Sequence, residues 1–194
     1  MVTMPTDVAV LAEMQSLLDE VRRLRGDDPH QEGVAQAVAD ALTAAVESPA
    51  FYAWLCEQAS EVGEGRADLE HPLQLAPGRG YQAPHDHGEC WAVNVTITGS
   101  ARIRHYIRAD NGDQVVLRMT EEFLCDERKS DCADMKMAHE IMEVSPRVNL
   151  SVSCHSQSTV THHTYDLEQG TYQYITRGAD EPLASGPIQV IGLA

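Results

Sequence analysis

The sequence predicts a mainly β protein, a small jelly-roll barrel with an N-terminal helical segment. Three observations support this fold class. Short runs that alternate apolar and polar residues recur after residue 60, with turn-forming residues between them, as in antiparallel barrels. Residues 1–60 instead repeat apolar residues every three or four positions, which is the period of a helix with one buried face. The pair Asn111-Gly112 is a strong hairpin signal between two of the β runs.

The length and composition of the chain bound its class. Its 194 residues are expected to form one domain, in which residues 1–60 pack as a helical segment on a barrel of residues 61–194. The contents of 43% hydrophobic and 23% charged residues are ordinary for a globular protein. The formal net charge of -16 argues against nucleic acid or an anionic membrane as a partner.

Targeting signals and cysteine usage predict the compartment. The N-terminus shows no secretory signal, and no apolar run has the length of a transmembrane helix. The five cysteines are odd in number and lack C-x-x-C spacing, so we expect reduced thiols. These features predict a cytoplasmic protein.

Three helices are expected before the barrel. The first is capped by Asp7 and ends at Gly26. A second apolar pattern covers residues 34–46, and a third covers residues 51–55. A short strand at residues 72–75 follows and is expected to begin the barrel.

The next strands are predicted from alternation and turn residues. Residues 93–98 alternate apolar and polar side chains, and Gly99 is expected to form a tight turn. Residues 102–107 would be the return strand. The Asn-Gly pair at residues 111–112 then turns the chain into a strand at residues 114–119.

The alternation of apolar and polar residues is less regular after residue 120. Residues 120–138 are polar and are expected to form an irregular insertion or lid. Residues 141–146 suggest a strand that ends in a proline turn, and residues 148–154 and 159–165 suggest an antiparallel pair. The Gly- and Pro-rich tail of residues 178–192 is expected to wrap the barrel or to make a subunit contact.

A pair of histidines carries the strongest chemical signal. His85 and His87 are one residue apart at the entry to a strand. Because side chains alternate along extended backbone, both imidazoles can reach one divalent ion while Asp86 points away. The sequence therefore predicts a metal site at this turn.

The P-H-D-H-G run of residues 84–88, followed by a Trp/Val-rich strand and Gly99, resembles the first motif of the cupin superfamily. More narrowly, it is similar to bacterial thiol dioxygenases related to cysteine dioxygenase. Many cupins place a metal-binding Glu a few residues after the second His, and here that position is Ala92. The resemblance implies a cupin fold, the double-stranded β-helix form of the jelly roll, with a metal held by histidines alone.

A third ligand is expected because two imidazoles hold a metal weakly. The resemblance places it in the second cupin motif, on a strand that faces the first. With a shortened hairpin, His155 takes that position. His163, His162 and His139 stay open as alternatives, as does a two-histidine site with a weaker ligand or water.

The T-H-H-T-Y run of residues 161–165 resembles the S-x-H-x-Y element of cysteine dioxygenase. This resemblance implies that Tyr165 is a catalytic residue that orients substrate and oxygen, and that His163 is a catalytic residue that holds Tyr165. A substrate carboxylate would need a fixed arginine. The family's arginine has no counterpart near residues 73–75, and the possible substitutes, none of which is assigned, are Arg79, Arg102, Arg104 and Arg177.

The resemblance implies an enzyme, a non-haem metal-dependent oxidoreductase. It would oxidise the sulfur of a small thiol, such as cysteine or 3-mercaptopropionate, with O2, and a role in a biosynthetic pathway is one option. Fe(II) is the expected metal, with Ni or Mn as alternatives, and no further cofactor is expected. A metal-dependent cupin isomerase or lyase and a non-catalytic metal-binding cupin are the competing functions. Barrels of this type often pair, so a homodimer is a further expectation.

Overall fold

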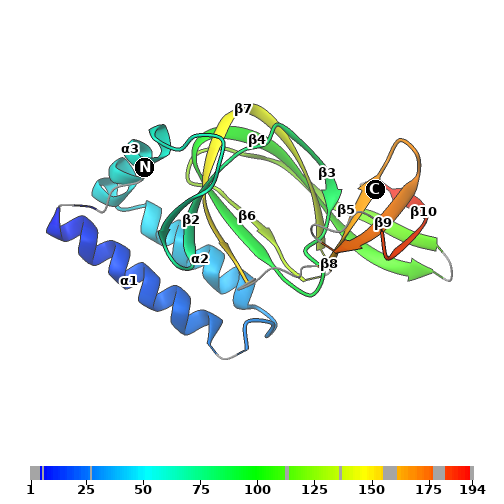
Figure 1. Ribbon diagram of the computed structural model, residues 1–194, viewed down its shortest axis with the longest axis horizontal. Helices are drawn as coiled ribbons and strands as arrows, with labels where there is room; N and C mark the ends of the chain where they lie inside the picture. Colours follow the sequence, from blue (N-terminus) through cyan, green and yellow to red (C-terminus); the bar gives the residue numbers. More distant parts are fainter. Residues whose placement is uncertain are drawn as a thin grey trace.

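The computed structural model describes residues 5, 7–26, 28–111, 114–135, 137–154, 161–176 and 182–192. Within these ranges three helices precede ten strands (Figure 1). The helices are α1 (Val8–Arg25), α2 (Val34–Val46) and α3 (Pro49–Ser60). The strands are β1 (Ala67–Glu70), β2 (Leu73–Pro77), β3 (Tyr81–His85), β4 (Ala92–Asn111), β5 (Gln114–Cys125), β6 (Ser130–Ala133), β7 (Met137–Ser153), β8 (Thr161–Asp166), β9 (Thr171–Thr176) and β10 (Ala184–Ile191).

Two of the three helices, α1 and α3, begin at a residue whose side chain caps the helix. The Asp7 carboxylate accepts the backbone N–H of Ala9 at 2.8 Å and so caps α1, and Gly26 ends this helix. Ser48 caps α3, whose first residue is a proline. The predicted helical pattern is therefore confirmed. None of the helices in the described ranges combines the length and apolarity needed to cross a membrane.

The strands form one sheet that closes on itself. The order of hydrogen-bonded neighbours is β1-β2-β7-β3-β8-β9-β10-β5-β4-β6, and β4 also pairs with β7. This additional pairing closes a ring from β7 through β3, β8, β9, β10 and β5 back to β4. In Figure 1, β8, β9 and β10 lie at the end of the sheet away from the helices. The predicted class, mainly β with an N-terminal helical segment, is confirmed.

The helices cover the outer face of β4 and β7. Val93, Val95 and Ile97 of β4 belong to the same buried apolar cluster as the helical core. Leu150 and Val152 of β7 extend this cluster. Because strand side chains alternate, the residues between them face the inside of the barrel. The helical layer therefore fixes which side chains of β4 and β7 reach the interior.

Gly99 lies in the middle of a strand, so the prediction of a tight turn there is wrong. β4 continues for 20 residues, and its pairing with β7 shifts register between Thr96 and Ala101. Gly99 has φ +77 at this irregularity, and a Cβ on it would meet the backbone carbonyl of Pro146. A glycine that permits a bulge and a glycine that permits a turn give the same sequence signal.

Substituting Gly99 with alanine is expected to destabilise the fold by about 2–4 kcal/mol, because positive φ and contact with the Pro146 carbonyl both penalise the new methyl group. Gly170→Ala is the matched control. Gly170 also has positive φ, but nothing lies within 4 Å of the place that an added Cβ would take, so we expect a loss of about 1 kcal/mol. Urea unfolding of the two variants measures the difference, and equal losses would show that packing at Gly99 is unimportant.

The prediction of an irregular insertion or lid at residues 120–138 is also wrong. β5 runs to Cys125, β6 covers Ser130–Ala133, and β7 starts at Met137. β6 alternates half-buried and buried positions, and one of its buried residues is Asp131. A charged side chain at an inward position hides the alternation that would otherwise indicate a strand.

The pairing of the last strands differs from the prediction. β7 runs continuously through Pro146, and β8 pairs with β3 and β9 rather than with residues 148–154. The hairpin after β4 is confirmed, since Asn111 pairs with Gln114. In the tail, β10 joins the barrel between β9 and β5.

Cys90 and Cys154 form a disulfide, which corrects the expectation that every cysteine is a reduced thiol. They are 64 positions apart in the sequence. Pairing of Ala92 with Ser153 between β4 and β7 brings their neighbouring residues together. The other cysteines, Cys56, Cys125 and Cys132, are free.

Candidate metal centre

Three imidazoles meet inside the barrel near one end of β3. His85 ends β3, His87 follows in the loop to β4, and His139 lies on β7. The Nε2 atom of His139 lies 3.2 Å from Nε2 of His85 and 3.3 Å from Nε2 of His87. One ligand atom from each residue lies within 4.8 Å of the other two. The rings converge on a common point from two strands and a loop.

Strand register brings these rings together. His85 pairs with His139 between β3 and β7, and His139 pairs with His105 between β7 and β4. Side chains directly opposite each other on adjacent strands have Cβ atoms about 4.5–5.5 Å apart. A row of imidazoles across three strands follows from this pairing. His87 joins the row because Asp86 points to the other side of the chain.

The outer nitrogens of two rings are fixed by hydrogen bonds. Nδ1 of His85 donates to the carbonyl of Ala83 at 2.9 Å, and Nδ1 of His139 donates to Oδ2 of Asp131 at 2.9 Å. When both rings are neutral, as metal binding requires, Nε2 of each carries a lone pair. Burial, with the neighbouring charge of His139, lowers the pKa of His85 to about 4. His85 is therefore neutral at pH 7, as a metal ligand must be.

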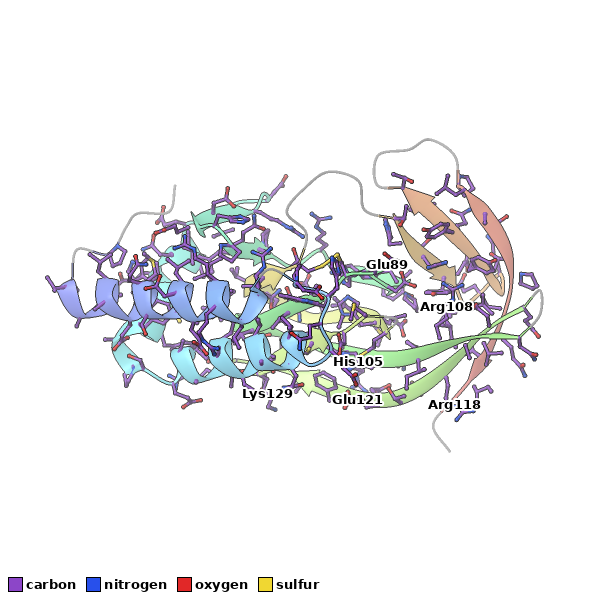
Figure 2. All side chains as sticks on the ribbon, turned by 90° about the horizontal axis from the view of Figure 1, so that it is seen from below. Glu89, His105, Arg108, Arg118, Glu121 and Lys129 are labelled. Atoms are coloured by element: carbon purple, nitrogen blue, oxygen red, sulfur yellow. A yellow bond between two sulfur atoms is a disulfide. The ribbon has the colours of Figure 1, made fainter. Side chains whose placement is uncertain are left out.

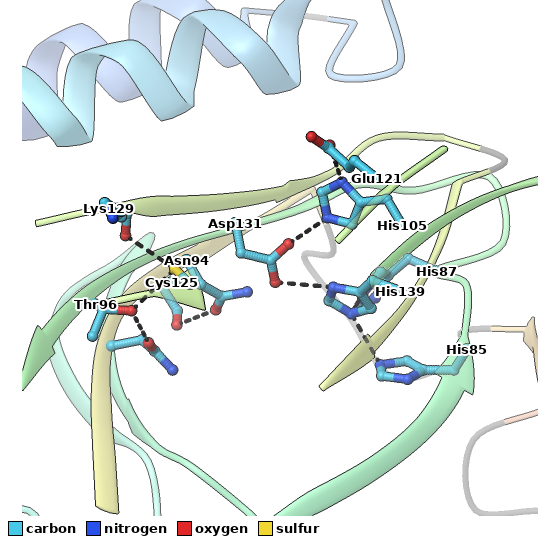
Figure 3. Close-up of polar contacts among 12 residues, drawn as sticks. His85, His87, Asn94, Thr96, His105, Glu121, Cys125, Lys129, Asp131 and His139 are labelled. Atoms are coloured by element: carbon cyan, nitrogen blue, oxygen red, sulfur yellow. Dashed lines mark hydrogen bonds and ion pairs between the residues drawn. The ribbon is translucent and has the colours of Figure 1, made fainter. Parts of the chain in front are cut away.

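Asp131 connects the three-histidine group to a longer chain of contacts. It is fully buried, and its Oδ1 accepts from Nε2 of His105 at 2.8 Å. Nδ1 of His105 lies 2.7 Å from Oε1 of Glu121. Figure 3 shows this chain from Glu121 through His105 and Asp131 to His139 and His85.

The charges along this chain stabilise one another. Burial alone would raise the pKa of Asp131, but the charges and hydrogen bonds of His139 and His105 hold it well below its usual range. Burial would lower the pKa of His105, but hydrogen bonds to Asp131 and Glu121 raise it. Asp131 is thus an anion that orients the ring of His139.

The geometry of the three nitrogens fits a divalent metal ion. For metal–nitrogen bonds of about 2.1 Å, nitrogens at adjacent coordination positions lie roughly 3.0–3.4 Å apart. The two Nε2–Nε2 distances of 3.2 and 3.3 Å fall in this range. Nε2 of a neutral ring with its proton on Nδ1 is an electron-pair donor, so a cation at the common point would interact with both rings. Within the described residues, this group contains no carboxylate.

The predicted ligands are placed as follows. The structure brings His85 and His87 together, with Asp86 turned away as the alternation predicted. His155 lies outside the described residues, so its assignment as the third ligand stays a prediction. The third ring in the described group is His139, one of the alternatives. His162 lies near enough for its charge to lower the pKa of His85 further, but it is not a member of the group.

The predicted catalytic residues His163 and Tyr165 surround Asp86. The Tyr165 hydroxyl donates to Oδ2 of Asp86 at 2.8 Å, and the backbone N–H of His163 donates to Oδ1 at 2.8 Å. Burial would raise the pKa of Asp86, but the hydrogen bonds from His163 and Gly88 lower it to about 2. Tyr165 is 1% exposed, and burial and the charge of Asp86 raise its pKa. A catalytic role for these residues stays a prediction; the contacts they make hold the segment that carries His85 and His87.

Replacing Tyr165 with phenylalanine is expected to cost about 1–2 kcal/mol of stability, because Asp86 loses one charge-assisted hydrogen bond and keeps the others. Tyr174→Phe is the control, since that ring stacks on His163 at 4.5 Å without using its hydroxyl for the contact. Denaturant unfolding and thiol-dependent O2 uptake are measured together. Unchanged stability with lost uptake would instead support the catalytic role that the sequence predicts.

The described arginines among those considered from the sequence either form ion pairs or are exposed to solvent. Arg102 and Arg104 both pair with Glu122, at 2.7 and 2.6 Å. Arg79 is exposed, and Arg177 lies outside the described residues. An arginine that the sequence did not single out, Arg108, lies at the barrel end away from the helices (Figure 2), with Nη1 2.6 Å from Nε2 of His163.

No family model and no curated protein matches this chain. Among solved structures, a hydroquinone 1,2-dioxygenase from a Sphingomonas species is similar at 14% identity and a TM-score of 0.38, over 50% of this chain and 70% of that one. A sugar phosphate isomerase of the cupin superfamily from Silicibacter pomeroyi is similar at 13% identity and a TM-score of 0.36, over 58% and 70%. A protein from Acidithiobacillus ferrooxidans described as a sugar phosphate isomerase is similar at 11% identity and a TM-score of 0.37, over 55% and 62%. At these scores the likeness covers only part of each chain and assigns no activity.

Proposed function

We propose that this protein is a non-haem, metal-dependent oxidoreductase of the cupin type that oxidises the sulfur of a small thiol with O2. The observation that carries the proposal is the convergence of Nε2 atoms from His85, His87 and His139. Fe(II) is the proposed metal, with Ni and Mn as alternatives. The resemblance of residues 84–88 to the thiol dioxygenase motif supports the reaction type. Cysteine, 3-mercaptopropionate or a related thiol is the proposed substrate.

The chain contributes ligands and their orientation. His85, His87 and His139 would hold the metal, and the Ala83 carbonyl and Asp131 keep two of these rings in the tautomer that binds it. The bound metal would supply open coordination positions where thiolate sulfur and O2 meet. In the dioxygenase reaction both oxygen atoms pass to sulfur, so the thiol becomes a sulfinate and no external reductant is consumed.

The surroundings of His139 would strengthen its interaction with a bound metal. His139 is 1% exposed, and Asp131 behind it is fully buried. Electrostatic interactions are stronger in such a site because water is largely excluded. The buried anion also offsets part of the positive charge that a divalent metal would bring.

The test is anaerobic purification, loading with Fe(II), and oxygen uptake with a panel of thiols. We expect uptake with at least one small thiol and a product that has gained two oxygen atoms by mass spectrometry. Turnover that continues without O2 would point to an isomerase or lyase instead. Absence of thiol-dependent uptake with bound Fe, Ni or Mn would contradict the proposal, and failure to bind any of these metals would indicate a different kind of binding protein.

A further inference from the structure

A second group of possible metal ligands lies on the face of the barrel that the helices cover. His30 belongs to the connection between α1 and α2, Cys90 precedes β4, and Cys154 follows β7. Both cysteines belong to the apolar cluster under the helices. One ligand atom from each of the three residues lies within 4.8 Å of the other two. Three segments that are far apart in the sequence thus bring two sulfurs and one imidazole to the same place.

The disulfide between Cys90 and Cys154 involves only two of these three residues. Reduction of this bond would leave two thiols beside the His30 ring. Zn–S bonds of about 2.3 Å in a tetrahedral site place two sulfurs roughly 3.8 Å apart. The Cα atoms of the two cysteines are 5.7 Å apart, so rotation about their Cα–Cβ bonds allows this separation without movement of the main chain.

The imidazole of His30 is oriented as in known metal sites. Its Nδ1 donates to the carbonyl of Glu89 at 2.8 Å, because a carbonyl can only accept. In the neutral ring Nε2 therefore carries the lone pair. Histidines that bind metals almost always donate their other ring N–H to a carbonyl or carboxylate. His85 makes the same kind of contact with the carbonyl of Ala83.

Hydrogen bonds that do not involve sulfur hold the three segments in place. Nε1 of Trp91, which is fully buried, donates to the carbonyl of Pro29 at 2.6 Å. The backbone N–H of His30 donates to Oδ1 of Asp28 at 3.0 Å. The backbone N–H of Cys154 donates to the carbonyl of Trp91 at 3.2 Å. The ligand positions are therefore expected to persist when the disulfide is opened.

The charge near Cys154 suits a thiolate ligand. Nη2 of Arg25 donates to the carbonyl of Cys154 at 3.3 Å, and Cys154 is 5% exposed. A cation beside a cysteine favours the thiolate, which is the form that binds metals. A divalent ion with two thiolates is electrically neutral, so its binding would add no net charge beside Arg25.

We propose that His30, Cys90 and Cys154 bind a second divalent metal ion when the cysteines are reduced, with Zn(II) as the best match. Thiolate and imidazole ligands suit Zn(II), and the described group contains no carboxylate that would favour Mg(II) or Ca(II). Three ligands leave the fourth tetrahedral position to water or another donor. The inference is independent of the proposed function, because it uses none of the ligands of the three-histidine group.

The exchange between the two states balances as follows. Opening the disulfide takes two electrons and two protons from a dithiol, which itself becomes a disulfide. Binding of Zn(II) then forms two sulfur–metal bonds and releases the two thiol protons, while the ion keeps its charge. The same two cysteines would join the loop before β4 to the end of β7 in both states, and the metal would add the α1–α2 connection through His30.

The experiment uses Co(II) as the probe. Cobalt bound to thiolate has a sulfur-to-metal charge-transfer absorption that a site made only of histidines lacks. The full chain is reduced with a phosphine, which takes up one oxygen from water as the disulfide becomes two thiols, and is then freed of reductant without O2. Circular dichroism checks the fold before Co(II) is added. Oxidised wild type is titrated in parallel.

The variants separate the ligands from other thiols and histidines. His30→Ala keeps both cysteines, whereas Cys90→Ser and Cys154→Ser each remove one sulfur. Cys56→Ser is the matched control for a free thiol outside the group, and His71→Ala is the control for an exposed histidine.

We expect reduced wild type to bind Co(II) with the thiolate absorption, and Zn(II) to displace the cobalt and remove this absorption. Oxidised wild type and both cysteine variants should lack it. His30→Ala is expected to weaken Co(II) binding at this site at least about 10-fold, because one of three ligands is lost. Cys56→Ser, His71→Ala and His139→Ala should keep the absorption, the last because its three-histidine group is a separate site.

Absence of the thiolate absorption in folded, reduced wild type would overturn the inference. The same conclusion would follow if His30→Ala bound Co(II) as tightly as the wild type, or if the absorption were lost in Cys56→Ser and kept in Cys90→Ser. Thiolate-bound cobalt in a protein that oxidises no thiol would support this site and leave the proposed function rejected. The two hypotheses can therefore fail separately.

Discussion

Replacing His139 with alanine is expected to remove the bound metal and, with it, thiol-dependent oxygen uptake. Its Nε2 atom is the point on which the other two rings converge, at 3.2 Å from His85 and 3.3 Å from His87. Two imidazoles that remain hold a divalent ion weakly. Elemental analysis of the protein purified with Fe(II) is expected to fall from about one metal per chain to below about 0.1.

Two further variants make this result specific. His71→Ala removes an exposed histidine outside the site and is expected to keep its metal. His155→Ala tests the ligand that the sequence favoured. Loss of metal in His155→Ala and retention in His139→Ala would reject the site described here. Loss in both would add His155 to the three-histidine group.

Replacing Asp131 with alanine is expected to destabilise the protein by about 3–5 kcal/mol, because two buried histidines lose their shared anion. Its pKa lies well below the usual range because His139 and His105 hold the carboxylate ionised. Metal affinity is expected to fall about 10- to 100-fold, as is typical when the partner of a ligating histidine is removed. Urea unfolding of the metal-free protein and competition with a chelator measure the two effects.

Surface and conservative variants provide the controls. Asp126→Ala removes a carboxylate that is 45% exposed in its ion pair with Lys129, and we expect it to cost less than about 0.5 kcal/mol. Asp131→Asn keeps an acceptor for one of the two histidines and should be intermediate. If Asp131→Ala matched Asp126→Ala in both measurements, the buried contacts of Asp131 would have no role in the fold or in metal binding.

Sequence reasoning succeeded where the signal is local. The helix caps, the Asn111–Gln114 hairpin and the side-by-side placement of His85 and His87 depend on residues a few positions apart. The third ring could not be singled out among the candidate histidines in this way, because His139 is 52 residues from His87 and reaches it only through pairing of β3 with β7. Predicting it needs the register between strands, which no short pattern contains.

The error at residues 120–138 has a physical cause, because a charged side chain can be buried when other groups pair with it. Asp131 looks like a surface position in the sequence, yet it is buried in the barrel between His105 and His139. The apparent irregularity of residues 120–138 came from reading such charges as exposed. The wrong prediction of a turn at Gly99 has another cause, because a glycine with positive φ occurs in β-bulges as well as in turns.

The helical layer and the interior that holds the histidines lie on opposite faces of the same two strands, β4 and β7. Val93, Val95 and Ile97 anchor α1–α3 from outside, while Asn94 and Thr96 between them line the inside. Without the helices, the barrel would therefore expose an apolar surface that promotes aggregation. Repacking of the side chains under the helices would also move the inward-facing side chains of β4 and β7. A redesign of this barrel therefore has to keep α1–α3.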